Sequence, residues 1–422
     1  MNLQTLKAVM LENQREVERQ TIIPRHFNLE DFGNYIIVGI RRAGKSFLMY
    51  QRMQQLLSQG IGWNRMLYIN FEDERLQEFT TQDFNSILEC HMEMYDGERP
   101  MLFLDEIQIV EGWEKFARRL ADQKYRVYIS GSNAKMLSSE FMTTLGGRYI
   151  PIYVYPYSFV EYLEATETPH DETDRLTTAG RAAIKSRFAD YLSHGGFPEG
   201  INLGTNRDYL TSVYQKIYLN DIASRNNISN TASLNVMFKK LAESVMQPIS
   251  FLRLASVITA TGRSVSANSV AKYIDAAVDA WLITPVSNIA APLSQRESSR
   301  KYYFTDNGLL NLFLINQKSS LLENLVATTL LRRFGREQSV YFNSRPTGEV
   351  DFYIPENETA YQVAYSVTDL SARSREITAF RTLSASLPCA HRVILTYDDH
   401  TTISTATGSI EVLPLWLWLL TE

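Results

Sequence analysis

The chain has 422 residues, and at ~150 residues per domain this length predicts about three domains. Its 42 Lys and Arg residues against 47 Asp and Glu residues leave a formal charge of -5, which argues against a protein that coats nucleic acid with a uniformly basic surface. The two cysteines, Cys90 and Cys389, exclude a disulfide framework and favour a reducing, cytoplasmic compartment. No apolar run reaches the ~20 residues that a bilayer requires, so no membrane partner is expected.

The first part of the chain alternates short apolar runs with helical patterns. Four runs read as buried strands, at residues 35–39, 66–71, 100–106 and 125–132, and a fifth follows Arg148. Continuous apolar strands separated by helices are typical of a parallel sheet that is covered on both faces. The pattern therefore predicts a doubly wound α/β domain over residues 1–155.

The rest of the chain divides into three predicted regions. Residues 156–207 are mostly helical and form a lid or connector. Residues 208–310 are helical and include a helix, a glycine-containing turn, a second amphipathic helix ending in AWLI, and two short strand-like pieces; this order fits a winged helix-turn-helix. Residues 311–422 begin with a helix and continue as strands, the last of them running through SIEVLPLWLWLL. This order predicts a second α/β unit.

Residues Gly39 to Ser46 read GIRRAGKS, which is the G-x-x-x-x-G-K-[ST] pattern of a phosphate-binding loop. Gly39 permits a tight turn after the strand, and Gly44 lets the backbone approach a phosphate because no Cβ intervenes. A helix that begins near Lys45 would aim its free amides at the phosphates. The alternative is an ordinary glycine-rich turn, but the apolar strand before the motif and the helical pattern after it favour the phosphate loop. The residues expected to bind ATP are Gly39, Ile40, Arg41, Arg42, Ala43, Gly44, Lys45, Ser46, Phe47 and Ser132.

A second motif supports magnesium-dependent hydrolysis. The apolar run MLFLDEIQ ends in two acids, Asp105 and Glu106. At the carboxyl edge of a parallel sheet Asp105 would hold Mg²⁺ together with the Ser46 hydroxyl, and Glu106 would orient the attacking water. Lys45 would neutralise the β- and γ-phosphates. A surface acidic pair after a core strand is the competing interpretation, and the phosphate loop makes it remote.

Five further residues have both a functional and a structural interpretation. Ser132 and Asn133 follow a strand and could contact the γ-phosphate or the water, or cap the next helix. Arg148 follows a glycine pair and could neutralise transition-state charge, in cis or from a neighbouring subunit, or be an exposed loop residue. Arg41 and Arg42 could contact phosphate or a partner subunit, or be solvated.

Taken in order, these motifs and several others resemble a prokaryotic group of AAA-family ATPases. The segments that carry the resemblance are GIRRAGKS, LDEIQ, ISGSN, LGGR, PYSFVEYL, GGFPE, YFTDNGLL and GEVDF. The group joins an AAA domain to a C-terminal domain of unknown function that contains a winged helix and a restriction-endonuclease-like fold. The resemblance covers nearly the whole chain. It implies an α/β fold class, with a P-loop AAA-type parallel sheet domain, a helical winged-helix region and a C-terminal restriction-endonuclease-like α/β domain. It also implies ATP and Mg²⁺ as cofactors and an ATPase activity.

The resemblance also implies that the C-terminal domain is a degenerate nuclease. The nuclease-like fold expects an acid on the first helix, an acid on one strand and [EQ]-x-K on the next. Glu323, Asp351 and Gln362 occupy these positions, but Ala364 stands where the lysine is expected. Without the ammonium the attacking water would lack activation. The alternative is that Glu349 and Asp351 are only the solvent face of an edge strand.

Three function classes follow from these features. The first is an ATP-driven motor or remodeller that acts on DNA, with the chain assembled as a ring or dimer. The second is a nucleotide-dependent switch that engages a protein partner. The third, a small-molecule kinase, is weakened by more than 200 additional residues. The expected second helix of the winged helix-turn-helix carries one Lys and two Asp, which disfavours DNA reading because phosphate neutralisation supplies most of the affinity.

Overall fold

The structure is a computed structural model that describes residues 1–204, 206–315, 318–344, 348–405 and 408–421. Contacts along the chain divide it into two compact units, Met1–Tyr155 and Pro156–Glu422.

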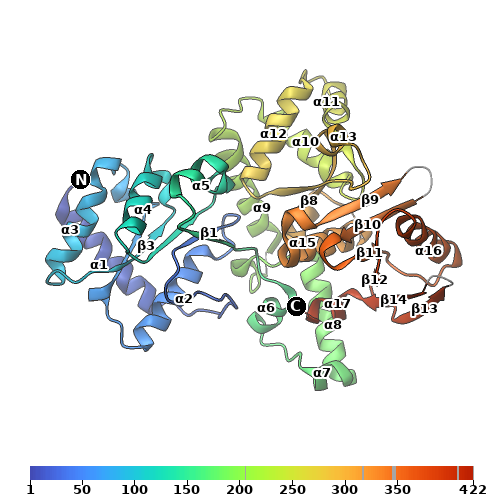
Figure 1. The fold of residues 1–422 in the computed structure, drawn as a ribbon, viewed down its shortest axis with the longest axis horizontal. Coiled ribbons are helices and arrows are strands. Elements are labelled where there is room, and N and C mark those ends of the chain that lie inside the picture. The colour runs from blue at the N-terminus through green and yellow to red at the C-terminus, as the bar shows by residue number, and fades with distance from the viewer. Residues whose placement is uncertain (205, 316–317, 345–347, 406–407, 422) are drawn as a thin grey trace. The chain divides into compact units, whose positions relative to one another are not determined.

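The first unit is built on a parallel sheet of five strands with the order β2-β3-β4-β1-β5. Figure 1 labels β1 and β3 of this sheet. The strands are β1 (Tyr35–Val38), β2 (Met66–Asn70), β3 (Met101–Asp105), β4 (Val127–Gly131) and β5 (Ile150–Tyr153). The five strands predicted from apolar runs are confirmed. Their order adds that β4 separates β1 from β3, so the strand before the phosphate loop and the strand before the acids are not neighbours.

Helices precede and connect the strands of this sheet. They are α1 (Leu3–Arg19), α2 (Lys45–Ser58), α3 (Phe84–Met94), α4 (Trp113–Asp122) and α5 (Ser139–Leu145). The side chain of Asn2 caps α1 by accepting from the amide of Gln4. The helix buries Leu6, Val9, Met10 and Val17, a spacing that places apolar side chains on one face of a helix. This face packs against β2, α2 and α3.

The second unit begins with helices and a small antiparallel sheet of order β6-β8-β7. Its helices are α6 (Phe159–Ala165), α7 (Glu172–Leu176), α8 (Thr178–His194), α9 (Asn206–Lys216), a π-helix (Ile217–Ser224), α10 (Thr231–Glu243), α11 (Phe251–Ala260), α12 (Ala267–Asp279), α13 (Leu293–Ser298) and α14 (Asn307–Asn311). The strands are β6 (Ile249–Ser250), β7 (Ile283–Val286) and β8 (Ser299–Phe304). The second helix of the expected helix-turn-helix ends before AWLI, because Trp281 takes a φ of 60° and β7 starts two residues later.

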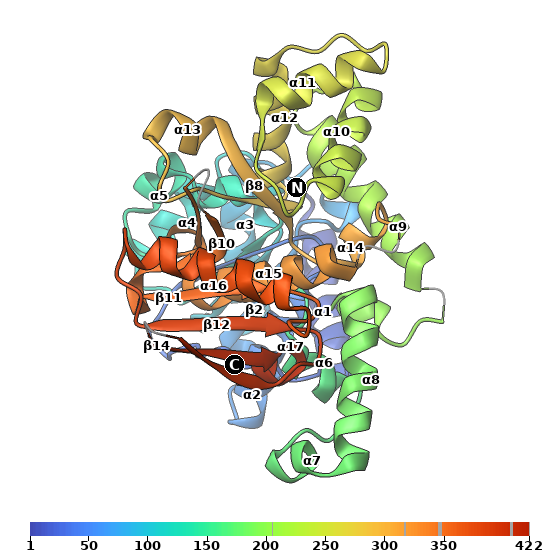
Figure 2. The same cartoon turned by 90° about the vertical axis from the view of Figure 1, so that its right-hand side faces the viewer.

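The second unit continues as a six-stranded mixed sheet with the order β13-β14-β12-β11-β10-β9. Its elements are α15 (Lys318–Gln338), β9 (Val340–Ser344), β10 (Gly348–Ile354), β11 (Thr359–Val363), α16 (Leu370–Ser384), β12 (His391–Thr396), β13 (Thr401–Thr405), β14 (Gly408–Pro414) and α17 (Leu415–Trp418). Both α15 and α16 pack against β10 (Figure 2). The last run was expected to be one strand, and this is wrong: the strand ends at Pro414 and α17 follows.

Candidate nucleotide-binding site

The phosphate loop joins the buried strand β1 to α2. Gly39 has a φ of 154°, and a Cβ built there would lie 2.0 Å from the carbonyl oxygen of Val154, so no side chain fits. Ile40 and Ala43 are buried, and the amide of Ala43 donates to the carbonyl of Ile40 at 3.2 Å. Gly44, with a φ of 97°, is the residue that precedes α2. The loop therefore turns back on itself and ends at a helix N-terminus, where free amides favour anions.

Lys45 begins α2 and reaches across to the end of β3. Its ammonium donates to the carbonyl of Ile40 at 3.4 Å and pairs with Glu106 Oε1 at 3.3 Å. Both side chains of the pair are buried. The structure thus brings together the lysine and the acid that the sequence assigned to phosphate binding and to water activation.

Asp105 ends β3 with its carboxylate surrounded by hydroxyl groups. Tyr68 donates to Oδ2 at 2.9 Å and Ser130 donates to Oδ1, and the Ser46 hydroxyl is close enough to act on the pKa of Asp105 by lowering it. Burial, and then the charge of Glu106, raise the pKa of Asp105. The two expected magnesium ligands, Ser46 and Asp105, therefore lie close together.

Glu106 follows β3 in a left-handed conformation, with a φ of 51°. Its amide donates to the Ser130 hydroxyl at 3.1 Å, and its carboxylate oxygen Oε2 accepts from the Ser132 amide at 3.2 Å and from the Gln108 side chain. Burial acts to raise the pKa of Glu106, but the ammonium of Lys45 and the hydrogen bond from Gln108 outweigh it, so the pKa lies below its ordinary value. Glu106 is therefore ionised at neutral pH.

Two buried polar atoms beside Glu106 lack a partner within the part of the chain that the structure describes. They are the Ser132 hydroxyl and Gln108 Oε1. Buried polar atoms are costly when unpaired, so the Ser132 hydroxyl favours a bound water or phosphate oxygen, and Gln108 Oε1 favours a bound water. Together with the hard oxygen donors of Ser46 and Asp105, they fit a magnesium–nucleotide complex.

The remaining predicted nucleotide contacts are less buried. Arg41 pairs with Glu72 at 2.9 Å, and its charge also contributes to lowering the pKa of Glu106. Arg42 is exposed and has a φ of 63°, an uncommon conformation for a residue with a side chain. Phe47 is partly exposed, and its ring lies 5.4 Å from that of Tyr50.

Asn133 and Arg148 have structural partners in this chain. The Asn133 side chain accepts from the Lys135 amide at 2.9 Å, as a cap of the turn that follows β4. Arg148 pairs with Asp122, at the end of α4, at 2.5 Å and donates to the carbonyl of Gly146 at 3.2 Å. These contacts hold Arg148 to α4 and to the end of α5, and its assignment to catalysis stays a prediction.

Sequence reasoning missed four residues that position the site. Ser130 bridges both acids, Tyr68 holds Asp105, and Gln108 holds Glu106. Arg25 is buried and donates to the carbonyl of Ala43 in the phosphate loop at 3.0 Å. A serine inside an apolar strand was a usable signal for Ser130; the other three depend on tertiary contacts.

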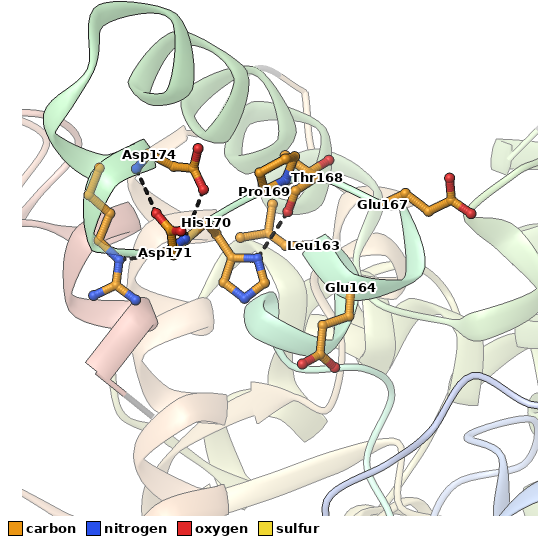
Figure 3. Close-up of a pocket in the computed structure, with 9 residues that line it drawn as sticks. Leu163, Glu164, Glu167, Thr168, Pro169, His170, Asp171 and Asp174 are labelled. Carbon is orange, nitrogen blue, oxygen red and sulfur yellow. Dashed lines mark hydrogen bonds between the residues drawn. The ribbon is translucent and has the colours of Figure 1, made fainter.

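A hollow of about 530 Å³ lies in the second unit (Figure 3). It is lined by Leu163, Glu164, Glu167, Thr168, Pro169, His170, Asp171, Asp174 and Arg175. Asp171 and Asp174 are occupied in capping α7, and His170 contacts the carbonyl of Thr168. Four carboxylates in the lining repel phosphate, so this hollow is a poor nucleotide site.

Comparisons with known proteins agree with the class that the fold and the site define, an AAA-type P-loop ATPase fold. Residues 31–163 match a family model described as an AAA domain, and residues 185–320 match one described as a domain of unknown function (DUF8612). An uncharacterized protein of Haemophilus influenzae is 32% identical over 345 residues, which cover 79% of this chain and 83% of that protein. An uncharacterized protein of Methanocaldococcus jannaschii is 29% identical over 429 residues, which cover 98% of this chain and 95% of that protein.

The chain belongs to this family of prokaryotic proteins, in which an AAA domain precedes a domain of unknown function. Solved structures are more distant. A Walker-type ATPase of Pyrococcus abyssi has 13% identity and a TM-score of 0.42, with 72% of this chain and 95% of that chain covered. Cdc6p of Pyrobaculum aerophilum has 14% identity and a TM-score of 0.27, with 77% of this chain and 93% of that chain covered. TM-scores this low support no functional conclusion.

Among the described residues, no helix combines the length and the apolar character needed to span a bilayer.

Proposed function

We propose that this protein binds ATP with Mg²⁺ and hydrolyses it at the phosphate loop. The observation that carries the proposal is the buried ion pair of Lys45 with Glu106, next to Asp105 at the end of β3. The amides of the loop and Lys45 would hold the phosphates, and Ser46 and Asp105 would hold Mg²⁺. The ion would neutralise the charge that develops on the transferred phosphoryl group.

Glu106 is the residue that we assign to the attacking water. Its carboxylate is ionised, and its αL backbone and the Ser132 amide fix its direction. The unpaired Ser132 hydroxyl and Gln108 Oε1 beside it offer a donor and an acceptor to that water. A water held in this way would be oriented for in-line attack on the γ-phosphate.

In the first candidate function, which the sequence favours, the cycle of ATP binding and hydrolysis drives an action on DNA. The order α11, turn, α12, β7 and β8 supports a winged helix-turn-helix. The charge of α12, with Lys272 against Asp275 and Asp279, weakens it.

A second candidate is a nucleotide-dependent switch that engages a protein partner. The Lys45–Glu106 ion pair favours it, because a phosphate that binds Lys45 competes with Glu106 for the same ammonium. Nucleotide binding alone would then release the Glu106 side chain, and hydrolysis would restore the pair.

Two substitutions test the assignment of the site. Lys45→Ala should weaken ATP binding, because the phosphate charge loses its cation. Glu106→Gln should keep ATP binding and lower the turnover by ~10² or more, since the water-orienting carboxylate is removed. Phosphate release and nucleotide binding would be measured side by side, with the exposed Glu111→Gln as the matched control. Native turnover in the Glu106→Gln protein would refute the role given to Glu106.

The target is tested by measuring ATP hydrolysis with and without single- and double-stranded DNA. Stimulation that weakens as salt is raised from 50 to 200 mM supports a DNA-acting cycle. A rate that is unchanged by every DNA supports the switch.

A further inference from the structure

A lysine fills the centre of the acidic cluster in the second unit. Lys301 lies on β8, and its side chain is fully buried. Its ammonium lies 2.7 Å from Glu349 Oε1, 3.2 Å from Glu323 Oε1 and 3.6 Å from Asp351 Oδ1. Glu323 comes from α15, and the other two acids come from β10. Three separate elements therefore meet at one cation that the chain itself supplies.

Two acids of this cluster, Glu323 and Asp351, occupy positions expected from the resembling nuclease fold, but Gln362 takes a different role. Its Oε1 accepts from the Asp351 amide at 2.9 Å, and its Nε2 donates to the Glu349 carbonyl at 2.9 Å. Both ends of the amide thus join β11 to β10, and the side chain is not directed at an ion. Ala364, where the fold expects a lysine, packs against the apolar core of the sheet.

Each carboxylate also has a second donor from the protein. Tyr303 donates to Glu323 Oε1 at 2.8 Å, the Asn343 side chain donates to Glu349 Oε2 at 2.8 Å, and the Val363 amide donates to Asp351 Oδ2 at 2.9 Å. Burial, followed by the charge of Glu323, raises the pKa of Asp351 well above its ordinary value. Protein donors therefore help to stabilise the negative charge that Lys301 does not neutralise.

These residues do not fit a divalent ion. Mg²⁺ requires near-octahedral oxygen ligands at ~2.1 Å, and the ammonium already stands among the three carboxylates that would supply them. Two cations in one buried site would repel each other strongly. Within the described ranges, no group of three or more His, Cys, Asp or Glu is arranged to hold a metal ion.

We propose that the Lys301 ammonium takes the place of the divalent cation in this restriction-endonuclease-like unit. The cluster is then a buried network of ion pairs that links β8 to α15 and β10 without a metal ion. The unit consequently does not cleave DNA. The missing lysine of the β11 motif and the lysine present on β8 are separate facts: the first removes an activating group, and the second fills the ion's position.

Manganese binding to the full-length, nucleotide-free protein tests this proposal. Bound Mn²⁺ would be counted by electron paramagnetic resonance. The stabilisation of the protein by Mn²⁺ would be measured by thermal unfolding. The native protein should show no Mn²⁺ site that Asp351→Asn removes. Lys301→Met should create one, because three carboxylates lose their cation, and Lys301→Met combined with Asp351→Asn should lose it again. Lys318→Met, an exposed lysine on α15, should resemble the native protein.

Two results would overturn the proposal. One is a native Mn²⁺ site, or DNA cleavage in Mg²⁺ or Mn²⁺, that disappears in Asp351→Asn. The other is a folded Lys301→Met protein that gains no Mn²⁺. If Lys301→Met does not fold, the comparison of the native protein with Asp351→Asn still decides, because it leaves Lys301 in place.

Discussion

Two adjacent carboxyl groups, Asp105 and Glu106, illustrate how neighbours decide the state of a buried acid. Both are buried, but their pKa values move in opposite directions. Asp105 is surrounded by neutral hydroxyls and faces the charge of Glu106, whereas Glu106 faces the ammonium of Lys45. Asp105 therefore gains most from a divalent cation that replaces lost solvation, and Glu106 stays ionised and able to accept a hydrogen bond from water.

A third buried acid, Asp306 in the second unit, predicts a pH effect on stability. Burial raises its pKa to about 6, against hydrogen bonds from the amides of Gly196 and Gly308. The folded state therefore binds a proton that the unfolded chain has released above its pKa of 3.8. Because the folded state holds the extra proton, the contribution of Asp306 to the free energy of unfolding falls by roughly 3 kcal/mol at most as the pH rises from about 4 to about 6. Above pH 6 this contribution stays constant.

The measurement is the free energy of unfolding of the native protein minus that of Asp306→Asn, at several pH values. Asparagine cannot ionise, so other titrating groups cancel in the difference. The difference should become less favourable to the native protein between pH 4 and pH 6 and stay constant above. A difference that is independent of pH, or rises with pH, would contradict the shifted pKa.

At the scale of elements, the junction of β1 with the phosphate loop depends on Gly39. A Cβ at this position would lie 2.0 Å from the Val154 carbonyl, which follows the neighbouring strand β5. The Val154 amide donates to Val38 at 2.7 Å, so the two segments cannot separate without losing sheet pairing. We therefore expect Gly39→Ala to displace the loop and to weaken ATP binding by ~10-fold or more, because the loop amides would no longer point at the phosphates.

Gly60→Ala separates this clash from backbone strain. Gly60 follows α2 with a φ of 85°, and a Cβ there would meet nothing within 4 Å. The substitution should cost about 1 kcal/mol of stability from the left-handed backbone alone and leave ATP binding unchanged. Equal nucleotide affinity in the two variants, measured by titration calorimetry, would show that the contact with Val154 does not control the loop.

The sequence predicted those parts of the site that lie next to one another along the chain. The phosphate loop and the acids after β3 carry local patterns of strand, turn and helix, and their pairing follows from parallel topology. Tyr68 could not be assigned, since its contact with Asp105 depends on the strand order β2-β3-β4. The position of Ser130 inside an apolar strand was a usable signal, but its contact with Asp105 depends on the same strand order. The last run of the chain was predicted as one strand because apolar residues alone do not show that the backbone turns into a helix after Pro414.

Lys301 shows a limit of a different kind. The motif of the nuclease-like fold lies on one helix and two strands, and within it Ala364 indicates a missing lysine. The ammonium comes instead from β8, which belongs to the small sheet β6-β8-β7 and precedes α15 in the chain. A buried lysine in an apolar strand was the available signal, because lysine is rarely buried unless it is paired.

At the scale of the whole molecule, Arg148 tests whether one chain completes the site. Within the chain Arg148 pairs with Asp122, so we expect a catalytic role only toward a neighbouring subunit. Arg148→Ala should then lower turnover and leave ATP binding nearly intact, and mixing it with Lys45→Ala should restore part of the activity, because each protein supplies the half-site that the other lacks. Arg118→Ala is the matched control, since Arg118 also pairs with Asp122, at 3.8 Å. Turnover would be measured beside light scattering in ATP. A monomer in which the two arginine variants hydrolyse ATP equally well would contradict the role in trans.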